Sequence, residues 1–76
     1  MNITPQQCRA ARAWLDWKQE ELAKAAGVSL STVRDFEKGR RKPIANNCRA
    51  ITEVFAQQKI SMNFHNDGRA KGIAAD

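Results

Sequence analysis

Residues 19–39 read QEELAKAAGVSLSTVRDFEKG, a pattern that predicts two short helices joined by a tight turn. In the first half, Leu22, Ala23 and Ala26 form a narrow apolar stripe at helical spacing, and charged residues lie opposite them. Gly27 follows at the place where a helix ends in a left-handed residue, a conformation that glycine adopts without a steric penalty. The first of the two helices is therefore expected to end at this glycine.

The second half of the segment predicts a helix from about Leu30 to Lys38. Ser29 can cap this helix by accepting a backbone N–H, and Gly39 is typical of a helix end. Val33 and Phe36 give it a buried pair at spacing i, i+3. Two helices joined by a short turn that contains glycine are the helix-turn-helix unit, whose second helix can lie in the major groove of DNA.

The same residues resemble those of a known family. QEELAKAAGVS, STVRDFEKG and the basic run after them are similar to the Cro and phage-repressor class of helix-turn-helix proteins, the XRE family, and the likeness covers roughly residues 4–55. The resemblance implies a compact lambda-repressor-like helical domain that binds DNA. Two positions depart from the family pattern. Asp16 stands where glycine often ends the first helix, and Lys18 stands where a Ser, Thr or Asn cap is usual.

Helices are also expected on both sides of this segment. Thr4 and Pro5 are typical of a helix start, and Gln7 can complete a capping box, so a first helix is expected over residues 5–15. A further apolar stripe predicts a fourth helix from residue 45 or 46 to residue 57, with a scaffold role beneath the helix pair.

The period of the sequence changes after Gln58. Ile60, Met62 and Phe64 alternate with polar residues, which indicates a half-buried strand, and HNDG supplies a turn. This strand either folds back on residues 72–74 as a hairpin or pairs with a second copy of the chain. We therefore expect a mainly α fold, a lambda-repressor-like helix-turn-helix bundle of four or five helices over residues 1–58. Residues 59–76 form a C-terminal strand or hairpin and a candidate dimerisation element.

Composition restricts the class of protein. The 76 residues suffice for one domain, and the net charge of +5 favours a polyanionic partner. Nine of the thirteen Lys and Arg residues lie between Arg9 and Lys42. Four of these nine crowd together at the end of the predicted second helix of the pair, which favours nucleic acid over a membrane; they are Lys38, Arg40, Arg41 and Lys42. The sequence carries no membrane-length apolar run and no signal-peptide pattern, so a cytoplasmic location is expected. It shows no enzyme constellation and no phosphate loop, and no cofactor is expected.

The cysteines and tryptophans are assigned structural roles. Cys8 and Cys48 occupy apolar helix positions and are expected to be free thiols that act as small hydrophobic residues. Together with His65 they do not make a zinc pattern, so no metal site is expected. Trp14 and Trp17 are both expected to fill the core, and Trp17 is also placed to act as a hydrophobic staple before the next helix.

The outward face of the predicted helix over residues 30–38 is the candidate base-reading surface. With its apolar pair facing inward, the helix presents the candidate readers Leu30, Ser31, Thr32, Arg34 and Asp35. The resemblance implies base-reading roles for Leu30, Ser31 and Asp35. Leu30 can contact a thymine methyl group, and Ser31 can donate or accept a hydrogen bond. Arg34 can reach guanine or phosphate, and Asp35 can accept from cytosine.

Candidate phosphate ligands flank that helix. The resemblance implies that Gln19, at a helix N-terminus, binds a DNA phosphate, and a basic run follows the second helix. The complete set of candidate phosphate ligands is Lys18, Gln19, Ser29, Lys38, Arg40, Arg41 and Lys42. The resemblance also implies a partly buried ion pair between Arg12 and Glu37 that ties the reading helix to the scaffold.

Two functions fit these residues. The first is a sequence-specific double-stranded DNA-binding transcription regulator, a repressor of the phage or prophage kind that occupies its operator as a homodimer through the C-terminal segment. Such a regulator blocks or recruits RNA polymerase. The alternative is an antitoxin that represses its own promoter and binds a protein toxin.

Overall fold

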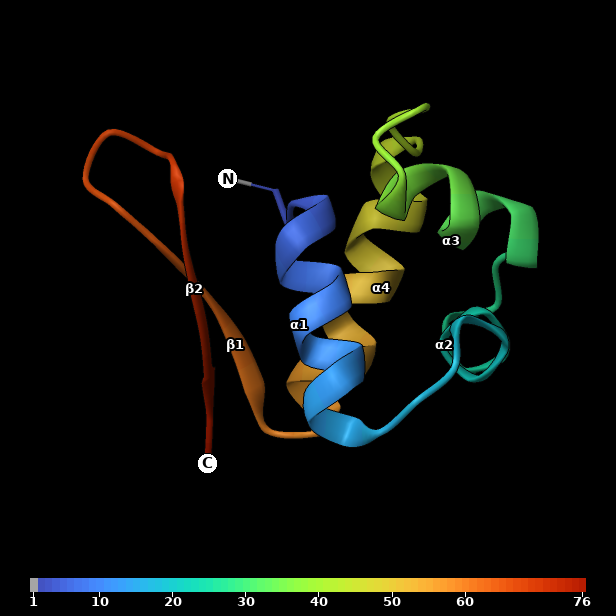
Figure 1. Ribbon diagram of the computed structural model, residues 1–76, viewed down its shortest axis with the longest axis horizontal. Coiled ribbons are helices and arrows are strands. Elements are labelled where there is room, and N and C mark those ends of the chain that lie inside the picture. Colours follow the sequence, from blue (N-terminus) through green and yellow to red (C-terminus); the bar gives the residue numbers. More distant parts are fainter. Residues whose placement is uncertain (1) are drawn as a thin grey trace.

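The computed structural model describes residues 2–76, which form four helices followed by a two-stranded antiparallel hairpin. Figure 1 shows α1 and α4 in the middle of the molecule, the hairpin on one side, and α2 and α3 on the other. The elements are α1 (Pro5–Leu15), α2 (Gln19–Ala26), α3 (Leu30–Glu37), α4 (Ala45–Gln57), β1 (Ile60–Phe64) and β2 (Ala70–Ala75). This order confirms the predicted helical bundle with a C-terminal hairpin. Among the helices of residues 2–76, none combines the length and the apolar character that a membrane span requires.

The predicted helix ends are formed by local hydrogen bonds. The hydroxyl of Thr4 accepts from the backbone N–H of Gln7, and the Gln7 side chain accepts from the backbone N–H of Thr4. Asp16 ends α1 in the left-handed region with φ of 58°, and Gly27 ends α2 with φ of 69°. Lys18 offers no side-chain cap to α2, but Glu21 accepts a hydrogen bond from the Lys18 backbone N–H. The entry to α2 is thereby stabilised from inside the helix.

The core lies where the four helices and β1 meet. Its fully buried side chains include Phe55, Leu22, Ile51, Ile60 and Val33. These residues come from α2, α3, α4 and β1, so each of these elements buries an apolar stripe or face in the core. The inward orientation predicted for Val33 and Phe36 is confirmed, because both side chains are buried in this cluster.

The two tryptophans differ in burial. Trp17 is half-buried against the core, and its ring centroid lies 6.4 Å from that of Phe55. Trp14 is 67% exposed, so the prediction that both tryptophans fill the core is wrong for this residue. Cys8 and Ala11 are fully buried on α1, which places Trp14 at the margin of the inner stripe.

The C-terminal strand finds its partner within the same chain. β1 and β2 pair in register from Ile60 opposite Ala75 to Asn63 opposite Gly72. Beyond that pair Phe64 lies opposite Ala70, so Lys71 and Gly72 form a bulge in β2. Of the two expected arrangements, the structure therefore has the hairpin within one chain.

A buried glutamine joins the hairpin to α1. The Nε2 atom of Gln7 donates to the backbone carbonyls of Asn63 at 2.9 Å and Gly72 at 3.0 Å, one on each strand beside the bulge. The Oε1 atom of the same side chain accepts from Thr4 N at 3.0 Å, and Gln7 is 2% exposed. Both ends of the amide are thus satisfied, and the hairpin is held against the first turn of α1.

Candidate nucleic-acid interface

Helix α3 presents the predicted base readers on its solvent side. Ser31 and Arg34 are exposed, whereas Leu30, Thr32 and Asp35 are half-buried. The helix begins where predicted, because Ser29 Oγ accepts from the Thr32 backbone N–H at 3.1 Å. It ends at Glu37, with Lys38 as the C-cap, one residue earlier than expected.

The hydroxyl groups at the start of α3 are already paired with one another. Ser29 Oγ lies 2.8 Å from Thr32 Oγ1 and 3.1 Å from Ser31 Oγ. Ser29 therefore has a capping role that sequence reasoning assigned to it, in addition to the predicted phosphate role. Ser29 and Ser31 are exposed and Thr32 is half-buried, and Ser29 caps the helix, so Ser31 is the exposed residue of the three without a capping role.

A groove of about 200 Å³ separates α3 from the loop that leads to α4. One wall carries three predicted readers, and the other carries the loop and the first turn of α4. The lining residues are Ser31, Thr32, Asp35, Arg41, Lys42, Pro43, Ile44 and Asn47. The fold thus brings part of the predicted phosphate set next to the predicted readers. It also adds three residues, Pro43, Ile44 and Asn47, that sequence reasoning did not include.

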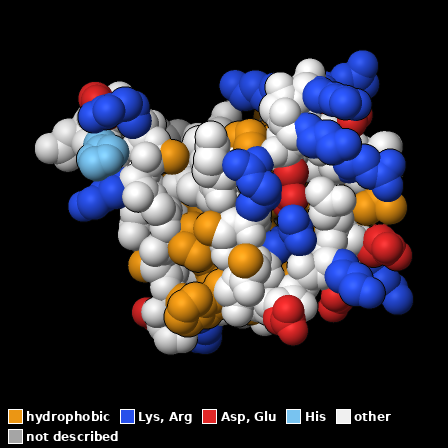
Figure 2. Space-filling model, viewed as in Figure 1, with side chains coloured by type: hydrophobic (Ala, Val, Ile, Leu, Met, Phe, Trp, Pro, Cys, Tyr) orange, Lys and Arg blue, Asp and Glu red, His pale blue; other side chains and the backbone are white. Residues whose placement is uncertain are grey.

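The basic residues after α3 are all accessible. Lys38, Arg40, Arg41 and Lys42 are exposed, and Figure 2 shows Lys and Arg side chains gathered over α3 and the loop that follows it. Gly39 permits the turn out of α3 with φ of 73°. The two exposed ion-pairing groups of the hairpin turn, Arg69 and Asp67, belong to a different part of the surface.

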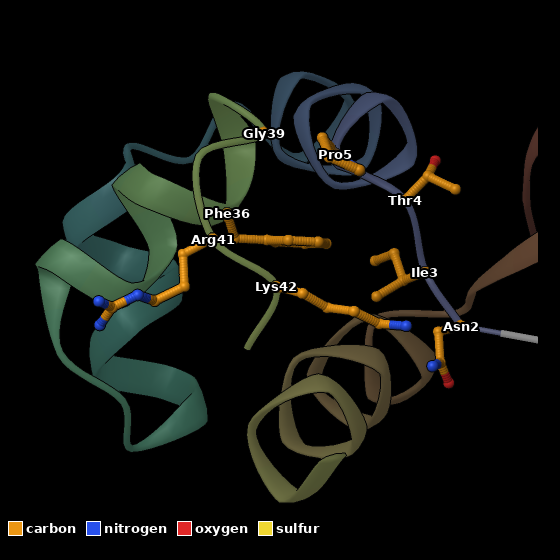
Figure 3. Close-up of a pocket in the computed structure, with 8 residues that line it drawn as sticks. All are labelled: Asn2, Ile3, Thr4, Pro5, Phe36, Gly39, Arg41 and Lys42. Atoms are coloured by element: carbon orange, nitrogen blue, oxygen red, sulfur yellow. The ribbon is translucent and has the colours of Figure 1, made fainter. Parts of the chain in front are cut away.

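Arg41 and Lys42 leave the loop in different directions. In Figure 3, Arg41 extends over α3, whereas Lys42 extends away from that helix toward Asn2. Both residues are among those that line a second hollow of about 400 Å³, to which Ile3 and Phe36 contribute apolar side chains. Both candidate phosphate ligands therefore line the groove beside α3, and Arg41 is the one whose side chain extends over that helix.

Glu37 is the centre of a hydrogen-bond cluster behind the interface. Its carboxylate accepts from Arg12 Nε at 2.7 Å and from Arg12 Nη2 at 2.7 Å, which makes a bidentate ion pair. It also accepts from Cys8 Sγ at 3.0 Å and from Gln19 Nε2 at 3.0 Å. Since Glu37 is 3% exposed, this one side chain fastens α3 to both α1 and α2.

The cluster fixes the ionisation of its members. Burial alone would raise the pKa of Glu37, but the hydrogen bonds from Arg12, Cys8 and Gln19 outweigh it and hold that pKa below the ordinary value. Burial, together with the adjacent Glu37 carboxylate, raises the pKa of the Cys8 thiol. Cys8 therefore stays protonated and donates, a role that the sequence pattern of an apolar helix position did not indicate.

Gln19 and Arg9 also meet at this cluster. Gln19 is half-buried, and its amide nitrogen binds Glu37, so the side chain predicted to contact phosphate is oriented by the ion pair behind it. Arg9 donates through Nη1 to the backbone carbonyl of Glu37, near the end of α3. Sequence reasoning did not assign this role to Arg9. Arg9 lies one turn before Arg12 on α1, so the two side chains share a face of that helix. This spacing is the sequence feature that indicates contact of Arg9 with the same end of α3.

Comparison with known proteins adds one finding. A family model for helix-turn-helix domains of the Cro/C1 type matches residues 9–56, which include α2, α3 and most of α1 and α4. A search of the curated proteins gave no match to the chain.

Proposed function

The chain belongs to the Cro/C1-type helix-turn-helix family of DNA-binding transcription regulators, and we propose that it is a sequence-specific repressor that acts by occupying its operator. In this proposal α3 enters the major groove of double-stranded DNA, and Ser31, Arg34 and Asp35 face the base edges. The basic residues on the flank of α3 bind the phosphate backbone and fix the register of the helix.

One observation carries the proposal. Exposed cations lie beside the solvent side of α3, and within residues 2–76 none of them forms an ion pair with a carboxylate. These residues are Lys38, Arg40, Arg41 and Lys42. Like charges placed together gain stability only when an anion lies near, and the phosphate backbone of DNA supplies a continuous row of such anions.

The backbone contacts come from two sides of α3. On one side is the start of α2, where Gln19 is oriented by Glu37 and Lys18 is exposed. On the other side is the loop after α3, from which Arg41 extends over the reading helix (Figure 3). Contacts on both sides would hold α3 at a fixed depth and angle in the groove.

The repressor is proposed to bind as a homodimer. Support comes from the two-fold symmetry of most operators and from the outer edges of a two-stranded sheet, which leave backbone groups unpaired. Because the hairpin is complete within one chain, the dimer contact would use its outer edge or face and would not exchange strands. A monomeric mass by light scattering, at concentrations that saturate operator DNA, would contradict this part of the proposal.

Selection of bound duplexes from a random pool at defined salt tests the proposal. We expect enrichment of one sequence with two related half-sites. Arg41→Ala should then weaken binding to all sequences about equally and reduce the slope of log K against log salt by about one. Arg69→Ala is the matched control, because it removes the same charge from the hairpin turn and should leave the slope unchanged. Absence of enrichment, with no binding to any duplex in dilute buffer, would overturn the proposal.

A further inference from the structure

Ile44 is an apolar side chain without a place in the core. Among residues 2–76, the large hydrophobic side chains that are exposed are Trp14, at 67%, and Ile44, at 68%. Trp14 lies on α1, whereas Ile44 lies two residues beyond the basic run 40–42, at the N-cap of α4. An isoleucine in this position buries little apolar surface and gains little of the stability that burial provides.

Ile44 also fails to stabilise the helix that it begins. The N-cap position favours Ser, Thr, Asp or Asn, whose side chains accept a backbone N–H, and isoleucine is among the poorest residues there. Accordingly, α4 begins without a side-chain cap hydrogen bond. Neither packing nor capping therefore accounts for this side chain.

The position of Ile44 relative to α3 suggests a use for it. Ile44 lines the groove of about 200 Å³ whose opposite wall carries Ser31 and Asp35. Arg41 and Lys42 line the same groove, so an apolar group, two cations, a hydroxyl and one carboxylate face one narrow space, and cations outnumber the carboxylate there. The unpaired cations beside it select a polyanion as the occupant, which favours a DNA strand over an apolar protein surface.

One base offers an apolar group at the major-groove edge, and that base is thymine, through its C5-methyl group. Building on the repressor function proposed above, we propose that Ile44 is a specificity-determining residue that contacts a thymine methyl group at the edge of the sequence read by α3. The reading surface then comprises α3 and the N-cap residue of α4, on the two walls of the same groove.

Replacing thymine with deoxyuridine removes the C5-methyl group and leaves base pairing intact, so it isolates this contact. Each thymine of the selected operator is replaced in turn, and the duplexes are titrated against the wild-type protein and the Ile44→Ser variant. Loss of one buried methyl group should weaken wild-type binding by about fourfold at one thymine in each half-site. The Ile44→Ser variant should have the same affinity for duplexes that carry thymine or deoxyuridine at that position. At every other thymine, the loss of affinity on replacement should equal that of the wild type.

The serine variant separates a base contact from a folding defect. Serine can cap α4, so its thermal midpoint should be equal to or above that of the wild type. Trp14→Ser is the matched control, since it removes the other exposed hydrophobic side chain from a different helix and should leave the deoxyuridine pattern unchanged.

Three results would overturn the inference. The first is equal deoxyuridine sensitivity in both proteins at every thymine. The second is weaker binding by Ile44→Ser with no coupling to any methyl group, which would assign Ile44 to the sugar-phosphate backbone. In either case the wild type still binds its selected operator, and the repressor proposal stands. The third result is failure of the wild type to select any sequence, which would overturn both proposals.

Discussion

Replacing Glu37 with glutamine should lower the free energy of unfolding by about 3 kcal/mol, because the change leaves buried donors without a charged acceptor. Glu37 is 3% exposed, and its carboxylate accepts hydrogen bonds from Arg12, Cys8 and Gln19. A carboxamide retains one acceptor oxygen and adds an NH₂ group that donates. The donors on the nitrogen side therefore lose their acceptor and face another donor.

The magnitude follows from the burial of the two partners. Removal of one member of a buried ion pair costs about 3–5 kcal/mol, since it strands the other charge. The lower end applies here because the Arg12 side chain is 19% exposed, so water reaches part of the guanidinium. For a domain of this size, a loss of about 3 kcal/mol corresponds to a fall of about 12–24 °C in the thermal midpoint.

Urea denaturation at pH 7, followed by far-ultraviolet circular dichroism, measures the difference. The control is Glu53→Gln, which removes the same charge from an exposed position on α4 and should stay within about 0.5 kcal/mol of the wild type. An effect of Glu37→Gln as small as that of the control would refute the reasoning, because it would mean that the cluster contributes no more than a surface pair.

Three further outcomes follow from the same structure. The folded-state pKa of Glu37 lies below the ordinary value of about 4.5, so the ionised side chain should stabilise the fold above pH 4.5, and this stabilisation should be lost as the pH falls through the lowered pKa. Urea titrations from pH 5 to pH 2 should show this loss of stability in the wild type and a smaller loss in Glu37→Gln. Gln7→Ala should lower the free energy of unfolding by about 2–3 kcal/mol and reduce amide-exchange protection in β1 and β2, because two strand carbonyls lose their donor. The control Gln6→Ala, at an exposed position, should change neither quantity. The Cys8 thiol is fully buried and its pKa is raised, so it should resist a thiol-reactive disulfide in the native protein and react only as fast as the chain unfolds; rapid native-state labelling of Cys8 would contradict its place in the cluster.

Features set by near neighbours in the sequence could be predicted. The caps at Thr4 and Ser29 act over three residues, and the left-handed end at Gly27 depends on the absence of one side chain. The solvent side of α3 follows from the inward pair Val33 and Phe36, because the helical period places Ser31 and Arg34 on the opposite face. These local signals account for the correct order of helices and for the exposure of Ser31 and Arg34 among the predicted readers.

Features set by distant neighbours could not be predicted in the same way. Gln7 binds strand carbonyls 56 and 65 residues away, and nothing near it in the sequence indicates those partners. Trp14 lies at the margin of an apolar stripe, where the placement of neighbouring elements decides between burial and exposure. The groove that is lined by both Ile44 and Ser31 likewise depends on how the loop before α4 packs beside α3.

The Glu37 cluster has a consequence for the thermodynamics of recognition. Because Glu37 fastens α3 to α1 and α2, the helix that we propose to read DNA has little conformational freedom left to lose on binding. The heat-capacity change of association should then match the area of the rigid contact alone, without the larger negative value that accompanies folding upon binding.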